Sequence, residues 1–258
     1  MQNNTFSTLF IAQNLIRLST VDSTNNFLKL MLSKSEPLPE GTVIMADDQY
    51  AGRGQQGNKW ISRAGCNLTF SIYLKPFFLP VDKQFMLNIA VSIGINNALR
   101  SYIPDGIKIK WPNDVYFDDK KIGGVLIENI ISAGNIKSTI IGIGINVNQR
   151  NYDGLGLNQV SSLGEILQQD VDLNKLLAQI CKCIEVEYLK LRSGDYDLQH
   201  DLYLKALYKF GEKCTYRDGE NTFEGKIINV TKTGLLMIDV EGERREYGFK
   251  EIEFLNKK

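Results

Sequence analysis

The sequence has few of the residues that most often carry catalysis, metal binding or disulfide bonding. It has one histidine, His200, so a Ser/His or Cys/His catalytic pair would have to use this residue, and a site with several histidine ligands is excluded. Four cysteines are too few and too irregularly spaced for a disulfide framework or a zinc cluster. Cys181 and Cys183 would lie on nearly opposite faces of a helix, which argues against a shared metal. We expect reduced, structural thiols.

The sequence also lacks net charge and long apolar runs. Lysine and arginine together number 30, as do aspartate and glutamate, so no overall field would attract nucleic acid or an anionic membrane. It has no run of about 18 apolar residues that could span a bilayer. Residues 1–14 do not have the pattern of a secretory signal peptide. We therefore expect a cytoplasmic protein that binds neither nucleic acid nor membranes.

Hydrophobic periodicity predicts an α+β fold, a central mixed or antiparallel sheet flanked by helices. Helices are expected to begin at 22–25 and to cover 82–102, 172–191 and 198–208. Strands are expected over 42–49 and 67–75, followed by an antiparallel meander over 107–111, 115–117, 122–131 and 137–147. From Gly211, short strands over 213–216, 223–230, 234–240 and 244–247 are typical of a small SH3-like β-barrel. These patterns predict a catalytic domain over 1–210 and an SH3-like domain over 211–258.

A glycine-rich segment over 52–60 reads G-R-G-Q-Q-G-N-K-W. Such a loop exposes backbone N–H donors, Arg53 adds a planar cation and Lys121 a point charge, which together suit a site for phosphate and carboxylate. The spacing matches G-x-G-x-x-G, but a dinucleotide fold needs a helix directly after the loop, and here a strand follows. A protein-kinase loop would need H-R-D and D-F-G motifs, which are absent. Taken alone, the glycines could simply form a wide surface turn.

Other motifs place this loop in a recognisable order along the chain. They are D-S-T-N at 22–25, Q-Y-A at 49–51, K-W-P-N-D at 110–114, K-I-G-G at 121–124 and G-I-G-I-N-V-N at 142–148. In this combination the sequence resembles the biotin protein ligases, also called biotin–[acetyl-CoA-carboxylase] ligases, over most of its length. Bifunctional members of that family carry a DNA-binding winged helix before the first motif, whereas only about twenty residues precede Asp22 here. The resemblance is therefore to the monofunctional type, and no repressor activity is expected.

The resemblance implies a two-step reaction. Biotin and ATP, with Mg²⁺, form biotinoyl-5′-AMP and pyrophosphate. A lysine of a biotin carboxyl carrier domain, of acetyl-CoA carboxylase or a related carboxylase, then attacks the mixed anhydride. Because two anions must meet at the α-phosphate, preorganised positive charge should be the principal catalytic device. The resemblance gives this catalytic role to Lys121 and Arg53.

The resemblance also indicates which residues bind the substrates. Those expected to bind biotin are Ser23, Thr24, Asn25, Gln49, Gly52, Arg53, Gly54, Gln55, Lys121 and Gly123. Those expected to bind ATP are Arg53, Gly54, Gln55, Trp60, Asn113, Asp114, Lys121 and Asn146, with Asp114 a candidate Mg²⁺ ligand. Without the resemblance, Ser23 and Thr24 could simply cap a helix, Gln49 could end a strand, and the residues around Asn113 could form a turn.

One position departs from the family pattern. Many relatives have arginine where Gln55 stands, and that arginine helps fold the loop over the adenylate and retain it. We therefore expect this chain to release biotinoyl-5′-AMP more readily. Replacing Gln55 by arginine should lengthen the dwell time of the bound adenylate severalfold, measured by quench-flow or dialysis. An unchanged dwell time would contradict the interpretation.

Two alternatives remain open from the sequence. One is a lipoate or octanoate ligase or transferase of the same superfamily, which acid specificity would distinguish. The other is a non-catalytic adaptor in which the SH3-like segment binds a protein and the loop has no ligand. The sequence is equally compatible with a monomer and a homodimer, because exposed sheet edges occur in both.

Overall fold

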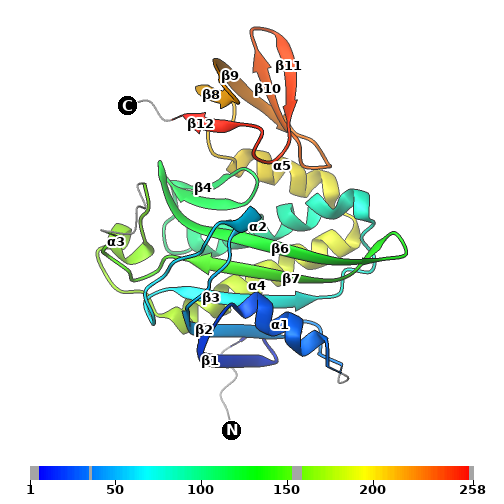
Figure 1. Ribbon diagram of the computed structural model, residues 1–258, viewed down its shortest axis with the longest axis vertical. Helices are drawn as coiled ribbons and strands as arrows, with labels where there is room; N and C mark the ends of the chain where they lie inside the picture. The colour runs from blue at the N-terminus through cyan, green and yellow to red at the C-terminus, as the bar shows by residue number, and fades with distance from the viewer. Residues whose placement is uncertain (1–5, 35–36, 153–158, 256–258) are drawn as a thin grey trace.

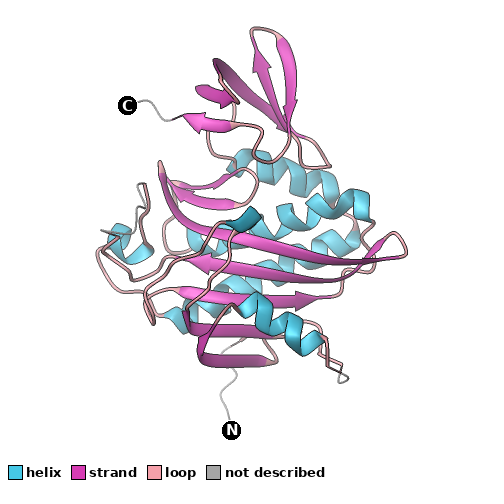
Figure 2. Cartoon of the chain, viewed as in Figure 1, coloured by secondary structure: helices cyan, strands magenta, loops and turns pink. Residues whose placement is uncertain are grey.

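The computed structural model describes residues 6–34, 37–152 and 159–255, which form two sheets and their covering helices (Figure 1, Figure 2). The larger sheet has the order β1-β2-β3-β7-β6-β5-β4. Its strands are β1 (Leu15–Val21), β2 (Val43–Gln49), β3 (Leu68–Leu74), β4 (Ile107–Lys110), β5 (Asp114–Phe117), β6 (Lys120–Ser132) and β7 (Asn135–Ile145). β1 runs parallel to β2, and the other neighbours are antiparallel. The predicted mixed sheet and the β4–β7 meander are confirmed.

Helices cover both faces of this sheet. On one face, α1 (Thr24–Leu32) buries Leu28 against Ile44, Tyr73 and Ile140, and Figure 1 shows this helix crossing in front of the strands. The other face carries the main core and three longer helices: α2 (Gln84–Arg100), α4 (Leu173–Ser193) and α5 (Tyr196–Ala206). α2 packs against both α4 and α5. The remaining helical turns are η1 (Gln55–Gly57), η2 (Val81–Lys83) and α3 (Leu163–Leu167).

Local sequence accounts for the ends and the packing of α4. The carboxylate of Asp172 accepts hydrogen bonds from the backbone N–H groups of Asn174 and Lys175 at the start of the helix. Gly194 ends the helix with φ +92°, a left-handed conformation that glycine adopts without strain. Along its length α4 approaches α2 at Gly94, where a Cβ atom would lie 2.8 Å from the Cα of Ile184. This glycine therefore allows the two helices to pack closely.

The C-terminal segment forms a second, antiparallel sheet. Its order is β11-β10-β9-β8-β12, and its strands are β8 (Lys213–Asp218), β9 (Asn221–Val230), β10 (Leu236–Val240), β11 (Glu243–Tyr247) and β12 (Glu253–Leu255). Within the described chain, the edge strands β11 and β12 are not paired with each other. The strands expected from the sequence are present, but hydrogen bonds do not close them into the predicted barrel.

The two sheets are joined by specific contacts near residue 111. The indole N–H of Trp111 donates to the carbonyl of Gly234 at 3.0 Å. The ring of Phe249, in the loop between β11 and β12, lies 5.9 Å from the ring of Trp111. Lys232 forms an ion pair with Asp197 of α5 at 2.8 Å. The C-terminal sheet therefore lies against the part of the larger sheet that carries the K-W-P-N-D motif. None of the described helices is both long and apolar enough to cross a membrane.

Candidate active site

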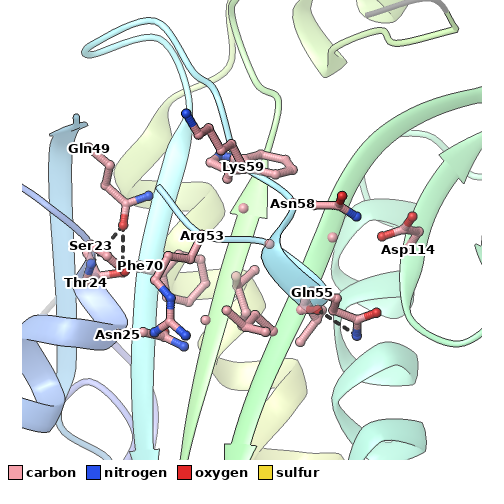
Figure 3. Close-up of a pocket in the computed structure, with 18 of the residues that line it drawn as sticks. Ser23, Thr24, Asn25, Gln49, Arg53, Gln55, Asn58, Lys59, Phe70 and Asp114 are labelled. Carbon is pink, nitrogen blue, oxygen red and sulfur yellow. Dashed lines mark hydrogen bonds between the residues drawn. The ribbon is translucent and has the colours of Figure 1, made fainter. Parts of the chain in front are cut away.

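A cavity of about 160 Å³ lies between α1, the glycine loop, β6 and β7 (Figure 3). The loop joins β2 to β3, as the sequence predicted. The cavity is also lined by Asn58, Lys59, Gly124, Gly142, Gly144 and Phe249. Gly52, Gly123, Asn113 and Asn146 are absent from its lining. It brings together ten of the residues expected from sequence: Ser23, Thr24, Asn25, Gln49, Arg53, Gly54, Gln55, Trp60, Asp114 and Lys121.

One end of the cavity is a cluster of hydroxyl and amide groups. Gln49 Oε1 accepts from both the backbone N–H and the hydroxyl of Thr24, at 2.8 and 3.1 Å. Ser71 Oγ lies 2.7 Å from Thr24 Oγ1 and 2.5 Å from Asn25 Oδ1. Ser23 stands at the N-cap position of α1, but its side chain makes no capping hydrogen bond. Because these buried groups include donors and acceptors, this end suits a small polar ligand group that offers both.

Two glycines of β7 provide the floor of the cavity. A Cβ atom on Gly142 would lie 2.4 Å from Asn25 Oδ1, and one on Gly144 would lie 2.4 Å from Cε2 of Trp60. Both positions therefore leave room for side chains that reach over the strand. The indole nitrogen of Trp60 is buried and has no hydrogen-bond partner among the described residues. An unpaired buried donor is costly, and a ligand acceptor at this point would remove that cost.

A lysine–carboxylate pair occupies another wall of the cavity. Lys121 Nζ lies 2.7 Å from Asp114 Oδ2, and each side chain is 32% exposed. A Cβ atom on Gly124 would lie 2.9 Å from Asp114 Oδ1, so this glycine makes space for the pair. At Gly123 a Cβ atom would instead meet the Ile145 side chain at 2.6 Å. Of the two glycines in the K-I-G-G motif, the second is therefore the one that shapes the cavity.

The amides of Asn113 and Asn146 are engaged in holding the protein together. Asn113 is only 4% exposed; its Oδ1 accepts from Gln55 Nε2 at 3.0 Å, and its Nδ2 donates to Asn88 Oδ1 at 2.9 Å. Asn146 Nδ2 donates to the carbonyl of Ser161 at 3.1 Å. In this arrangement Asn113 ties the glycine loop to the turn before β5. Asn113 reaches the cavity through Gln55, which lines it, whereas the partner of Asn146 does not line the cavity.

The glycine loop is a hairpin held by backbone hydrogen bonds across it. Gly54 N–H donates to the carbonyl of Asn58 at 2.7 Å, and Trp60 N–H donates to that of Gly52 at 3.0 Å. A Cβ atom on Gly52 would lie 2.4 Å from the Trp60 carbonyl oxygen, and Gly57 has φ +86°. These glycines are thus required by the turn itself.

Arg53 makes contacts that the sequence did not indicate. Its guanidinium donates to Asn26 Oδ1 at 2.8 Å and to Glu128 Oε1 at 2.9 Å. Glu128, on β6, also accepts from Lys29 and Asn25. Neither Glu128 nor Ser71 belongs to a motif. Glu128 is followed by the polar Asn129, and Ser71 alternates with Thr69 and apolar residues, so neither stands out in the sequence. Within the described chain, no group of three or more His, Cys, Asp or Glu side chains could hold a metal ion.

Comparison with known proteins gives a consistent result. The sequence pattern of the biotin/lipoate A/B protein ligase family matches residues 18–146. The bifunctional ligase/repressor BirA of Bacillus subtilis is 30% identical over 212 residues, which cover 81% of this chain and 65% of that protein. The biotin–[acetyl-CoA-carboxylase] ligase of Mycobacterium tuberculosis is 24% identical over 206 residues, which cover 79% of this chain and 75% of that protein. The structure of the Aquifex aeolicus biotin protein ligase in complex with biotin and ATP aligns with a TM-score of 0.79 and 31% identity, covering 95% of this chain and 100% of that one.

Proposed function

We propose that this chain, which belongs to the biotin/lipoate A/B protein ligase family, is an ATP-dependent biotin protein ligase. It would activate biotin as biotinoyl-5′-AMP and then transfer the biotinoyl group to a lysine of a carrier protein. The observation that carries this proposal is the cavity itself. It combines a buried hydroxyl and amide cluster at Thr24 and Gln49 with the Lys121–Asp114 pair. The solved structure of the A. aeolicus relative contains biotin and ATP.

In the first step, Lys121 supplies the charge that lets two anions meet. A biotin carboxylate oxygen forms a bond to the α-phosphorus, the bond to the β-phosphate oxygen breaks, and pyrophosphate leaves. A lysine ammonium between the carboxylate and the α-phosphate stabilises the negative charge that accumulates there. Lys121 Nζ is held by Asp114 at 2.7 Å, which fixes its position in the cavity wall.

Asp114 fits a Mg²⁺ ion that arrives with ATP. Mg²⁺ is commonly held by one or two carboxylates together with substrate phosphates and water. A single partly exposed carboxylate beside Lys121 matches this ligand set, and Asp114 would be the residue that holds the ion. When bound, the ion would supply further positive charge to the phosphates.

In the second step, the acceptor lysine attacks as a neutral amine. Its nitrogen forms an amide bond with the biotinoyl carbonyl carbon, the bond to the AMP oxygen breaks, and AMP leaves. We propose that the acceptor is a biotin carboxyl carrier domain of acetyl-CoA carboxylase or a related carboxylase. The name of the M. tuberculosis relative supports this choice. We further propose that residues 1–210 form the catalytic domain and residues 211–258 the accessory one.

The polar end of the cavity favours biotin over lipoate. The ureido group of biotin has both donors and acceptors that can bond to the hydroxyl and amide groups of this end, whereas the dithiolane ring of lipoate has none to offer them. A site built to hydrogen-bond its substrate rejects an analogue without those groups by about 10⁴-fold. We therefore expect acid-dependent pyrophosphate exchange, measured with ATP and Mg²⁺, to occur with biotin and not with lipoate. Exchange with lipoate alone would indicate the sister activity, and exchange with neither acid would favour the adaptor.

A further inference from the structure

We propose that Glu128 is a positioning residue that latches the glycine loop closed over the cavity and so prolongs retention of the activated intermediate. The part concerning the intermediate rests on the proposed function. The latch itself is a set of contacts within the protein. Glu128 does not line the cavity, so any effect on bound ligand must pass through the residues that it holds.

Three segments of the chain meet at the Glu128 carboxylate. From the loop, Arg53 donates to Oε1 at 2.9 Å and to Oε2 at 3.3 Å. From α1, Asn25 Nδ2 donates to Oε2 at 2.8 Å and Lys29 Nζ donates to Oε1 at 2.7 Å. Glu128 itself is fixed within β6, between pairings to β7. One carboxylate on a rigid strand therefore joins the loop to the helix that forms the polar end of the cavity.

The guanidinium of Arg53 is already engaged in hydrogen bonds within the protein. Two terminal nitrogens of its guanidinium already donate to Glu128 and Asn26, and Figure 3 shows its side chain extending from the loop toward Asn25. Elsewhere in the loop, Gln55 makes neutral hydrogen bonds to Asn113 and to the carbonyl of Val125. Because charge-assisted hydrogen bonds are stronger than neutral ones, the Arg53–Glu128 pair should dominate closure of the loop.

The ionisation of Glu128 agrees with this role. Burial opposes the charged form, but hydrogen bonds from Lys29, Asn25 and Arg53 outweigh it and hold the pKa of this carboxyl below its ordinary value. The charged groups facing it are Lys29 on α1 and Arg53 on the loop. A depressed pKa means that the contribution is present at neutral pH and is lost only as the pH falls through that lower value.

A double-mutant cycle tests the latch. Biotinoyl-5′-AMP is formed on the enzyme, and its dwell time is measured by rapid dialysis in the wild type, Glu128→Gln, Arg53→Gln and the double variant. Each single change should shorten the dwell time by about tenfold, and the double variant should show no further loss, because both remove one interaction. Additive effects, or a dwell time unchanged in Glu128→Gln alone, would mean that Arg53 acts directly on the ligand and would overturn the proposal.

Tryptic cleavage after Lys59 provides a readout that needs no ligand. Opening of the loop should expose the bond between Lys59 and Trp60, so Glu128→Gln should be cleaved faster than the wild type at equal thermal stability. Lys29→Gln is the matched control, since it removes a cation that reaches the same carboxylate from α1 and not from the loop. It should change cleavage and dwell time by no more than about twofold. Equal cleavage of wild type and Glu128→Gln would overturn the latch. Absence of biotin-dependent exchange in the wild type would instead refute the proposed function. The cleavage experiment would still test the latch, because it needs no ligand.

Discussion

Replacing Lys121 by alanine should slow biotin-dependent pyrophosphate exchange by about 10³-fold, the scale on which a preorganised charge aimed at the reacting centre contributes. Lys121 is the lysine paired with Asp114 in the cavity wall, and its removal leaves the two substrate anions without the cation between them. The measurement is exchange at saturating biotin and ATP, so that a loss in rate is separated from a loss in binding.

The neighbouring Lys120 provides the control for that experiment. It is exposed, begins the same strand and does not line the cavity, so Lys120→Ala should retain nearly full exchange. Asp114 is one-third exposed, and losing its partner should therefore change thermal stability little. Exchange by Lys121→Ala at a rate close to the wild type would refute the role given to this lysine.

A single methyl group at Gly142 should weaken biotin binding by about 10- to 100-fold. The added Cβ would lie 2.4 Å from Asn25 Oδ1 and 3.0 Å from its Cγ, and Asn25 is held by both Ser71 and Glu128. The methyl group would displace Asn25, and returning it to its place for binding would cost about 1–3 kcal/mol, the scale of overpacking. About 1.4 kcal/mol corresponds to a factor of ten. Isothermal titration calorimetry of Gly142→Ala with biotin measures the change.

The steric origin of that effect can be isolated in a second background. In a protein that already carries Asn25→Ala, the obstacle to the new methyl group is gone, and Gly142→Ala should then add little to the dissociation constant. Unchanged affinity in the single variant would show that Asn25 can move aside without cost. Additive losses in the double variant would place the effect elsewhere on β7.

Sequence patterns predicted the elements whose signals are local. The α2 and α4 helices have long apolar repeats. The strands of the β4–β7 meander are rich in β-branched and aromatic residues and are separated by short turns. β1 was not predicted, because Leu15, Ile16 and Leu18 do not alternate and its parallel pairing with β2 spans the whole of α1. β12 is only three residues long. Closure of the C-terminal barrel depends on the distance between its edge strands, which no local pattern encodes.

The site was predictable to the extent that its residues lie in motifs. The motif segments converge because β2, β6 and β7 bring the loop, Lys121 and the β7 glycines to one cavity. Glu128 and Ser71 were missed because the role of each arises from contacts with segments distant in the sequence. Asn113 and Asn146 lie in motifs, but their amides are consumed by Gln55, Asn88 and Ser161, which only the fold reveals.

Phe249 has a consequence for how this protein can diverge from its relatives. It lies in the loop between β11 and β12, packs on Trp111 and lines the same cavity as Lys121. The sequence pattern changes after residue 210, where the segment of the second sheet begins. Phe249 of this segment nevertheless lines the same cavity as residues of the first sheet. Exchange of the C-terminal segment between relatives by recombination would alter the cavity wall. Inherited substitutions at Phe249 and at Trp111 should therefore be selected as a pair.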